Sequence, residues 1–220
     1  MDPKTAHPED IAKMLRKPSG PFAKQFSELM HKGNIFLIDL TYETMDLKKD
    51  ESILEIGFAS GRSFEILFSN MNDIKATGID YSEEMVSQAR EINQDAVNSG
   101  KLNLYHGSSD NLPFGDNSFD KVYCNNVIYF WDDPSRHLEG VHRVLKPGGM
   151  FYTGIRTKET MLLMPTAQYG FTLYEEDDWV KILEQNGFRF ILTNKKADPP
   201  IEVEGHVFKM VSLCIAAEKA

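Results

Sequence analysis

The stretch Ser52-Ile53-Leu54-Glu55-Ile56-Gly57-Phe58-Ala59-Ser60-Gly61-Arg62 decides the fold. Apolar residues lead to an acid, two glycines follow, and the next apolar residues, at positions 64, 66, 67 and 68, have helical spacing. A strand, a glycine turn and a helix in this order bring bare backbone close to a small ligand at the edge of a parallel sheet. Glycine is required where a side chain would block that ligand or where the turn needs a positive φ. We therefore expect a ligand site at this turn.

The composition is that of an ordinary soluble globular chain, and the length suits one domain with a small additional element. Of the 220 residues, 41% are hydrophobic and 26% are charged. The net charge of −9 and the lack of a lysine or arginine block argue against a nucleic-acid partner. Cys124 and Cys214 lie in apolar runs and are predicted to be buried thiols in a reducing compartment. Because the sequence has no signal-peptide start, no bilayer-length apolar run and no zinc-ligand spacing, we expect a cytoplasmic protein without membrane or metal.

Strand-like and helix-like segments alternate along the chain. Alternation of this kind predicts an α/β fold with an open parallel sheet covered by helices on both faces. The last two strands are joined by residues 195–205, which contain Pro199-Pro200 and leave no room for a crossover helix, so we expect the final strand to run antiparallel. Thr172 with Glu175 fits a capping box at the start of the last helix. The predicted strands are residues 52–56, 76–80, 102–106, 121–124, 150–155, 188–193 and 208–217.

Two regions are predicted to lie outside the central fold. Residues 1–50 read as two or three short helices that form an N-terminal helical cap, with a break at Lys17-Pro18-Ser19-Gly20-Pro21. Residues 51–220 form the main domain. Within it, residues 157–171 read as irregular and are rich in methionine and leucine, and they fall in the segment 157–173. This segment is either a lid over an apolar substrate or ordinary packing.

The acid Asp80 ends the second strand, 19 residues after Gly61, where it can accept hydrogen bonds from both hydroxyls of a ribose. Two nucleotide-like ligands fit that position, a dinucleotide and S-adenosylmethionine (SAM). A dinucleotide turn accommodates pyrophosphate, which the acid at Glu55 would repel. The same acid suits the ammonium group of a methionine moiety, through water. No Tyr-x-x-x-Lys pair is present, which disfavours an oxidoreductase.

Four segments in this order resemble the class I SAM-dependent methyltransferases, specifically the small-molecule, type 11-like domain: residues 53–61, 78–85, 107–120 and 142–149. The resemblance covers about residues 51–155. It implies a Rossmann-like, seven-stranded, mostly parallel sheet in a three-layer sandwich. It also implies methyl transfer from SAM to a small-molecule acceptor with release of S-adenosylhomocysteine. The acceptor atom (O, N, C or S), the use of a general base, and the choice between monomer and homodimer stay open, and no catalytic residue is assigned.

The resemblance further implies cofactor contacts at ten positions. Residues 55, 57 and 61 would shape the methionine side of the pocket, position 80 would bind the ribose, and position 81 would pack on the adenine. Residues 108–110 would surround the adenine edge, and position 125 would approach the methionine portion. The ten are Glu55, Gly57, Phe58, Gly61, Asp80, Tyr81, Ser108, Ser109, Asp110 and Asn125.

Two positions depart from the family pattern. Ala59 replaces the middle glycine and adds a methyl group to the turn, and Ser108 replaces an acid that pairs with the adenine amino group. Either SAM affinity is lower than usual or Asp110 substitutes for that acid. These departures motivate one alternative, a non-catalytic SAM-binding regulatory protein. An NAD(P)-dependent oxidoreductase is a further, less favoured alternative. Residues 129–131, Tyr-Phe-Trp, either line the substrate pocket or anchor the next helix, and His31 is the histidine closest to the expected substrate mouth.

Overall fold

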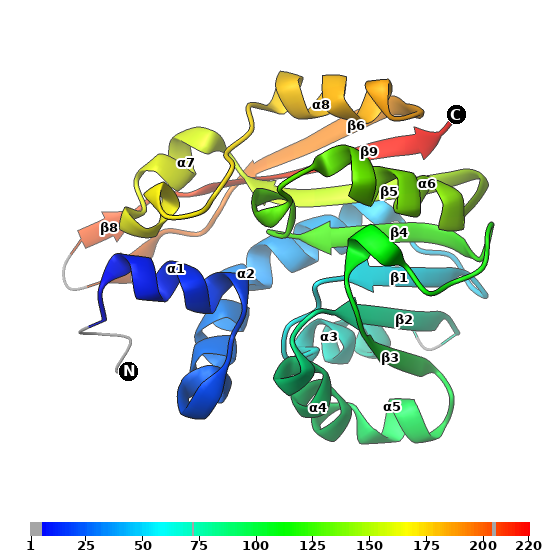
Figure 1. Ribbon diagram of the computed structural model, residues 1–220, viewed down its shortest axis with the longest axis horizontal. Helices are drawn as coiled ribbons and strands as arrows, with labels where there is room; N and C mark the ends of the chain where they lie inside the picture. The colour runs from blue at the N-terminus through cyan, green and yellow to red at the C-terminus, as the bar shows by residue number, and fades with distance from the viewer. Residues whose placement is uncertain (1–5, 72, 204–205) are drawn as a thin grey trace.

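A seven-stranded sheet runs through the middle of the molecule (Figure 1). The computed structural model describes residues 6–71, 73–203 and 206–220, with side chains described outside 201–208. The spatial order is β3-β2-β1-β4-β5-β9-β6. Strands β1 to β5 pair in parallel, whereas β9 is antiparallel to both β5 and β6, which confirms the predicted sheet. The strands are β1 (Ser52–Ile56), β2 (Lys75–Asp80), β3 (Leu102–His106), β4 (Phe119–Asn125), β5 (Leu145–Arg156), β6 (Phe188–Ala197) and β9 (Val211–Lys219).

Each face of the sheet is covered by its own set of helices, and each has its own hydrophobic core. One face packs against α2 (Ala23–Met45), α3 (Arg62–Asn70), α4 (Glu83–Ile92) and α5 (Gln94–Asn98). The other packs against α6 (Pro134–Val144) and α8 (Glu176–Gln185). Because β1 is buried on both faces, its neighbouring residues Ile53 and Leu54 are both apolar and fully buried, one in each core. The result is the Rossmann-like three-layer sandwich that the sequence implied.

The N-terminal region differs from the expected short helices. Here α1 (Pro8–Arg16) is short, η1 (Gly20–Phe22) follows the proline-rich break, and residues 23–45 form one helix of 23 residues. No proline interrupts residues 31–34, and Gly33 has no positive φ, so the helix continues through them. The second half of α2 buries Leu37, Leu40 and Met45 against the sheet. It ends at Asp46, whose φ of 44° is left-handed.

Three segments late in the chain also depart from the sequence-based expectation. Residues 157–171 are not wholly irregular, because they contain α7 (Lys158–Leu162) and η4 (Pro165–Gln168). The N-cap of α8 is Glu175 rather than Thr172, whose backbone N–H instead donates to the carbonyl of Tyr129 at 2.8 Å. Strand β6 extends to Ala197, and β7 (Ile201–Val203) pairs with β8 (His206–Phe208) ahead of β9. A backbone hairpin therefore occupies the connection that the two prolines made too short for a helix.

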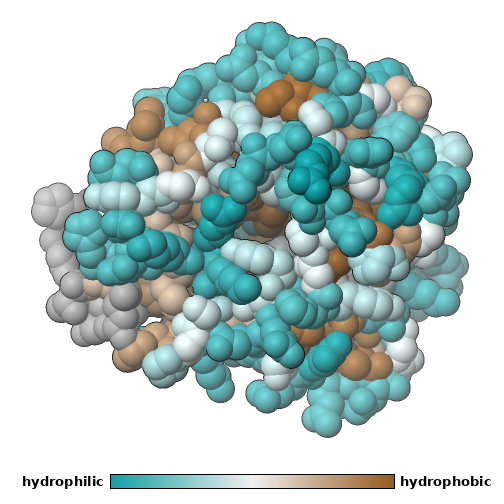
Figure 2. Space-filling view, in the orientation of Figure 1, coloured by the Kyte–Doolittle hydropathy of each residue, from teal (hydrophilic) through white to brown (hydrophobic). Residues whose placement is uncertain are grey.

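The carboxyl ends of β1, β2 and β4 point toward α1 and the first part of α2 (Figure 1). This is the edge of the sheet at which open α/β folds bind ligands. The face shown in Figure 2 is mainly hydrophilic, with hydrophobic residues gathered at the upper left over α7. Within the described residues, no helix combines the length and apolar character needed to cross a bilayer.

Candidate active site

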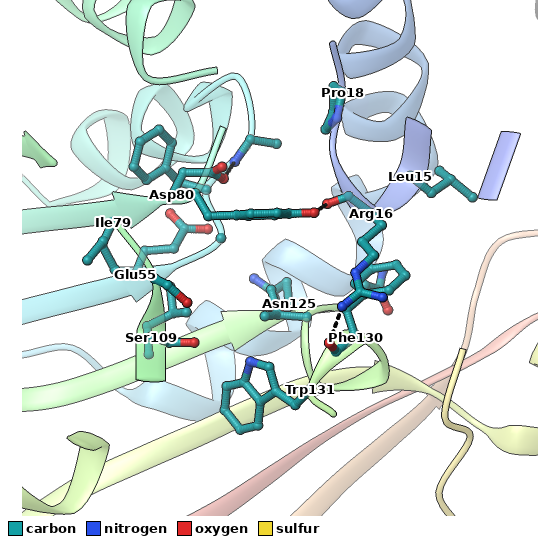
Figure 3. Close-up of a pocket in the computed structure, with 18 of the residues that line it drawn as sticks. Leu15, Arg16, Pro18, Glu55, Ile79, Asp80, Ser109, Asn125, Phe130 and Trp131 are labelled. Carbon is teal, nitrogen blue, oxygen red and sulfur yellow. Dashed lines mark hydrogen bonds between the residues drawn. The ribbon is translucent and has the colours of Figure 1, made fainter. Parts of the chain in front are cut away.

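A cavity of about 330 Å³ lies at the carboxyl ends of β1, β2, β3 and β4, within the size range of small-molecule and cofactor sites. The N-terminal segment and the loop after β4 close it from the opposite side, because Arg16 and Phe130 face Glu55 and Asp80 across the opening (Figure 3). Gly61 is the one predicted contact that does not line it. The nine that do are Glu55, Gly57, Phe58, Asp80, Tyr81, Ser108, Ser109, Asp110 and Asn125.

The glycines of the turn after β1 serve packing as well as ligand access. Gly57 has a φ of 74°, and a Cβ there would lie 2.5 Å from a methyl group of Val127. Gly61 also has a positive φ, and its Cβ would lie 2.7 Å from the Cβ of Ala89 on α4. The lack of a side chain at Gly61 therefore lets the start of α3 approach α4.

The carboxyl group of Glu55 lies beneath the turn, 3% exposed. Its Oε2 accepts hydrogen bonds from Ser63 Oγ at 2.8 Å and from the Tyr123 hydroxyl at 2.9 Å. Burial penalises the charged form and raises the pKa of Glu55 to about 7, despite those two donors. Both of these hydrogen bonds end on Oε2. A cationic group that reached Oε1 would therefore hold the carboxylate in its charged form.

The carboxylate of Asp80 organises the ends of β1 and β2. Its Oδ2 accepts the backbone N–H of Ala59 at 2.9 Å, and its Oδ1 accepts the backbone N–H of Ser82 at 2.8 Å. Burial raises the pKa of Asp80 to about 6. Each carboxylate oxygen has a further lone pair, so the group can still accept from two ligand hydroxyls. The same contact explains how the turn tolerates Ala59, which has a left-handed φ of 50°.

The first turn of α6 forms a wall that the sequence analysis missed. The imidazole of His137 stacks on Trp131, with ring centroids 4.6 Å apart and an interplanar angle of 2°, and its Nδ1 lies 2.7 Å from Ser109 Oγ. Burial lowers the pKa of His137, which favours the neutral ring. Next to it, a hydrogen bond from Ser108 lowers the pKa of Asp110. The sequence did contain a signal for this wall. Pro134 marks the start of α6, and a helix that begins there places the residues that follow, including His137, beside the strand ends.

Two neighbouring asparagines at the end of β4 carry buried amide atoms that have no hydrogen-bond partner among the described residues. Asn125 accepts from Thr41 Oγ1 at 2.7 Å, while its Nδ2 has no partner. Asn126 donates through Nδ2 to Asn34 Oδ1 at 3.0 Å, while its Oδ1 has no partner. Buried polar atoms of this kind are normally satisfied. A polar ligand bound at this wall would satisfy both.

A second cavity, of about 410 Å³, adjoins the first. The residues that line both are Leu15, Met30, Asn34, Asn126 and Phe130. Tyr129 lines only the second cavity, and its hydroxyl donates to the backbone carbonyl of Arg156 at 3.0 Å. The two cavities therefore meet where β4 ends, at the segment 129–131 whose role the sequence left open. Two of its three residues line the second cavity, and Trp131 lines the first.

A family model described as a methyltransferase domain matches residues 54–153, which include the turn after β1, Asp80 and Asn125. This match and the methyltransferase relatives support the resemblance to the class I SAM-dependent methyltransferases. The chain is 25% identical to the putative methyltransferase YrhH of Bacillus subtilis (strain 168) over 155 residues, 70% of its own length and 78% of YrhH. It is 31% identical over 120 residues to the ubiquinone/menaquinone biosynthesis C-methyltransferase UbiE of Geotalea daltonii, 52% of its own length and 51% of UbiE.

A solved structure shares nearly the whole fold of this chain. One chain of a Haloferax volcanii complex that contains the Trm112 methyltransferase activator matches it with a TM-score of 0.78 and 19% identity, over 97% of this chain and 99% of that chain. SAM is the cofactor of the family. The donor set fits it, because the cavity combines a buried acid, a second acid held by two backbone N–H groups, and the unpartnered Asn125 Nδ2. The comparisons do not favour the oxidoreductase alternative.

Proposed function

We propose that this methyltransferase transfers the methyl group of SAM to a small-molecule acceptor and releases S-adenosylhomocysteine. The observation that carries the proposal is the pair of adjoining cavities, because one can hold the cofactor while the other holds an acceptor. The two would meet at the shared wall, which is formed by the residues that line both cavities: Leu15, Met30, Asn34, Asn126 and Phe130. When bound, SAM supplies a methyl group on a positively charged sulfur. In the transfer, a lone pair of the acceptor forms a bond to the methyl carbon, the carbon–sulfur bond breaks with its electrons left on sulfur, and the acceptor releases a proton to solvent.

The proposed cofactor contacts follow the geometry of the first cavity. Glu55 takes the ammonium group of the methionine moiety, and Asp80 takes the ribose hydroxyls. Tyr81 packs on one face of the adenine, and Ser108, Ser109 and Asp110 contact its edge.

At the methionine end, the Nδ2 of Asn125 donates to the carboxylate of SAM. A carboxylate there would satisfy the buried donor that lacks a partner in the protein. The turn at Gly57 and Phe58 supplies the cavity wall between the methionine contacts and the ribose contact.

In this proposal the protein aligns the acceptor with the methyl group of SAM and keeps water out of the site. The sulfonium already activates the methyl group, so the rate depends on holding the acceptor atom in line with the carbon–sulfur bond. Arg16 and Phe130 close one side of the first cavity, and Phe130 also lines the second. Because these residues separate the shared wall from solvent, they favour transfer to the acceptor over hydrolysis of SAM.

Small acceptors are supported by what relatives act on. The name of UbiE refers to C-methylation in ubiquinone and menaquinone biosynthesis, and the name of resE of Aspergillus sclerotiorum refers to O-methylation. The test is release of S-adenosylhomocysteine, measured by mass spectrometry over a panel of phenols, amines, thiols and carboxylates. We expect acceptor-dependent release from the wild type and at least tenfold less from Asp80→Asn. SAM binding without turnover on any acceptor would instead support the regulatory alternative.

A further inference from the structure

The second cavity is strongly apolar. Its walls are built from α1, α2, the loop after β4, and the segment 160–171. The apolar residues that line it are Leu15, Met30, Tyr129, Phe130, Met161, Leu163, Met164, Pro165, Phe171 and Met210. Thioether and aromatic side chains adapt to ligands of varied shape, so this lining suits a hydrophobic body and would leave the polar groups of a sugar or an amino acid unsatisfied.

The buried cation at this cavity, Arg156, is compensated. Arg156, which lines it, is 4% exposed, and its guanidinium forms a buried ion pair with Asp198. The same guanidinium donates to the backbone carbonyl of Gly33 at 2.6 Å. Lys209 also lines the cavity, but its side chain is exposed. An anionic ligand would therefore meet no unpaired cation at Arg156 and would lose its hydration, which favours a neutral ligand.

One polar atom at the shared wall specifies the ligand's head group. The Oδ1 of Asn126 is buried without a hydrogen-bond partner among the described residues, while its Nδ2 donates to Asn34 Oδ1. An oxygen in this position accepts hydrogen bonds and donates none. Asn126 lines both cavities, so a group bound to it lies at the junction between cofactor and acceptor.

We propose that the second cavity binds the methyl acceptor as a neutral, apolar molecule whose reacting end presents an O–H or N–H group to Asn126 Oδ1. The proposal rests on the proposed function and adds the substrate class. Leu162 at the end of α7 and Leu163 directly after it are 66% and 62% exposed, and Figure 2 shows hydrophobic residues gathered over this helix. Leu163 lines the cavity, which places an apolar surface at its mouth.

The test compares three probes of one shape on the full-length protein loaded with S-adenosylhomocysteine. 1-Naphthol is neutral and carries an O–H donor, 1-methoxynaphthalene lacks the donor, and 1-naphthoate is charged. Calorimetry should give one binding site for 1-naphthol, about fivefold weaker binding of the methyl ether because the buried oxygen stays unpaired, and about tenfold weaker binding of the anion. Tighter binding of 1-naphthoate, or equal binding of all three, would overturn the proposal.

Matched variants locate the site. Met164→Glu places a charge in the cavity wall, whereas Leu162→Glu places one on the adjacent exposed residue that does not line it. We expect at least tenfold weaker 1-naphthol binding in the first and no change in the second, and Thr166→Glu provides a further wall variant. Equal effects of Met164→Glu and Leu162→Glu would contradict the assignment.

A separate variant tests the proposed hydrogen bond from the ligand to Asn126 Oδ1. Asn126→Gly suits the backbone, because the φ of this residue is 56°, and it removes the amide. It should abolish the preference for 1-naphthol over its methyl ether, and a retained preference would contradict the role of Asn126. Binding of S-adenosylhomocysteine, measured first in every variant, reports folding. Loss of that binding in the wild type would contradict the proposed function, whereas its retention without naphthol selectivity would contradict this inference alone.

Discussion

The phenolic hydroxyl of Tyr81 donates a hydrogen bond to the backbone carbonyl of Arg16, and this contact ties the end of α1 to the end of β2. The guanidinium of Arg16 in turn donates to the backbone carbonyl of Phe130 at 3.3 Å. Lys17 places its ammonium 5.1 Å from the centre of the Tyr81 ring. Arg16 thus joins two walls of the first cavity, one at Tyr81 and the other at Phe130. A ligand that enters from this side must pass these contacts (Figure 3).

Tyr81→Phe removes only the hydroxyl of this link. A single hydrogen bond contributes about 1 kcal/mol, so we expect the dissociation rate of S-adenosylhomocysteine to rise about fivefold in stopped-flow measurements. Tyr105→Phe is the matched control, because Tyr105 lies on β3, is exposed and does not line the cavity. Equal dissociation rates for wild type and Tyr81→Phe would show that the link does not restrain the ligand.

Ala59→Gly should stabilise the protein. Ala59 has a φ of 50°, which costs a residue with a side chain about 1–2 kcal/mol, and the greater freedom of glycine in the unfolded chain offsets part of the gain. We expect the free energy of unfolding in urea to rise by about 0.5–1 kcal/mol. Ala96→Gly, in the helix α5, is the opposite control and should lower it by about 1 kcal/mol. A less stable Ala59→Gly protein would show that the turn does not strain Ala59.

The raised pKa values of Glu55 and Asp80 predict how stability depends on pH. Both carboxyls keep their protons in the folded state to a higher pH than in the unfolded chain, to about 7 and about 6 respectively. Between about pH 4 and 7 the folded protein therefore binds more protons than the unfolded chain, and stability falls as the pH rises. We expect the Tm of the ligand-free protein to decrease from pH 5 to pH 8.

Glu55→Gln tests the upper part of this pH range, in which Glu55 loses its proton in the folded protein. The amide oxygen can still accept from Ser63 and Tyr123, but the group no longer ionises. The variant should keep a nearly constant Tm between pH 6.5 and 8 and exceed the wild type at pH 8. It should also bind SAM more weakly, because the charged partner of the ammonium group is gone. A Tm curve parallel to that of the wild type would assign the pH dependence to other groups.

The two substitutions of Asp80 separate ligand binding from folding. Asp80→Ala leaves the backbone N–H groups of Ala59 and Ser82 without their acceptor, so it should cost about 1–3 kcal/mol of folding free energy as well as SAM affinity. Asp80→Asn retains one acceptor, so it should cost less folding free energy than Asp80→Ala while binding SAM at least tenfold more weakly. Unchanged affinity in Asp80→Asn would remove Asp80 from the ribose contact.

The elements that the sequence predicted well are those whose signal is local. The strands around Glu55 and Asp80 are buried on both faces, so their apolar runs, turns and caps all indicate the same structure. The antiparallel β9 followed from the prolines at 199 and 200, which left no length for a crossover helix. The nine predicted residues that line the cavity lie at or just after the carboxyl ends of strands that lie side by side, since parallel strands end at one edge of the sheet.

The features that the sequence did not predict depend on contacts between distant segments. The continuity of α2 through Gly33 is set by packing on the sheet, and the position of Arg16 over the cavity is set by Tyr81 and Phe130. The stacking of His137 on Trp131 likewise requires α6 to be in place. Gly61 was assigned to the cavity because its turn was recognised, but only the neighbouring Ala89 reveals its packing role.

Calorimetric titration with SAM, S-adenosylhomocysteine and NAD is the most direct test of the central claim. The account predicts that both adenosyl ligands bind at one site per chain and compete with each other. It predicts no binding of NAD, because Glu55 stands where a pyrophosphate would have to approach. Binding of NAD without binding of either adenosyl ligand would contradict the assignment of the cavity.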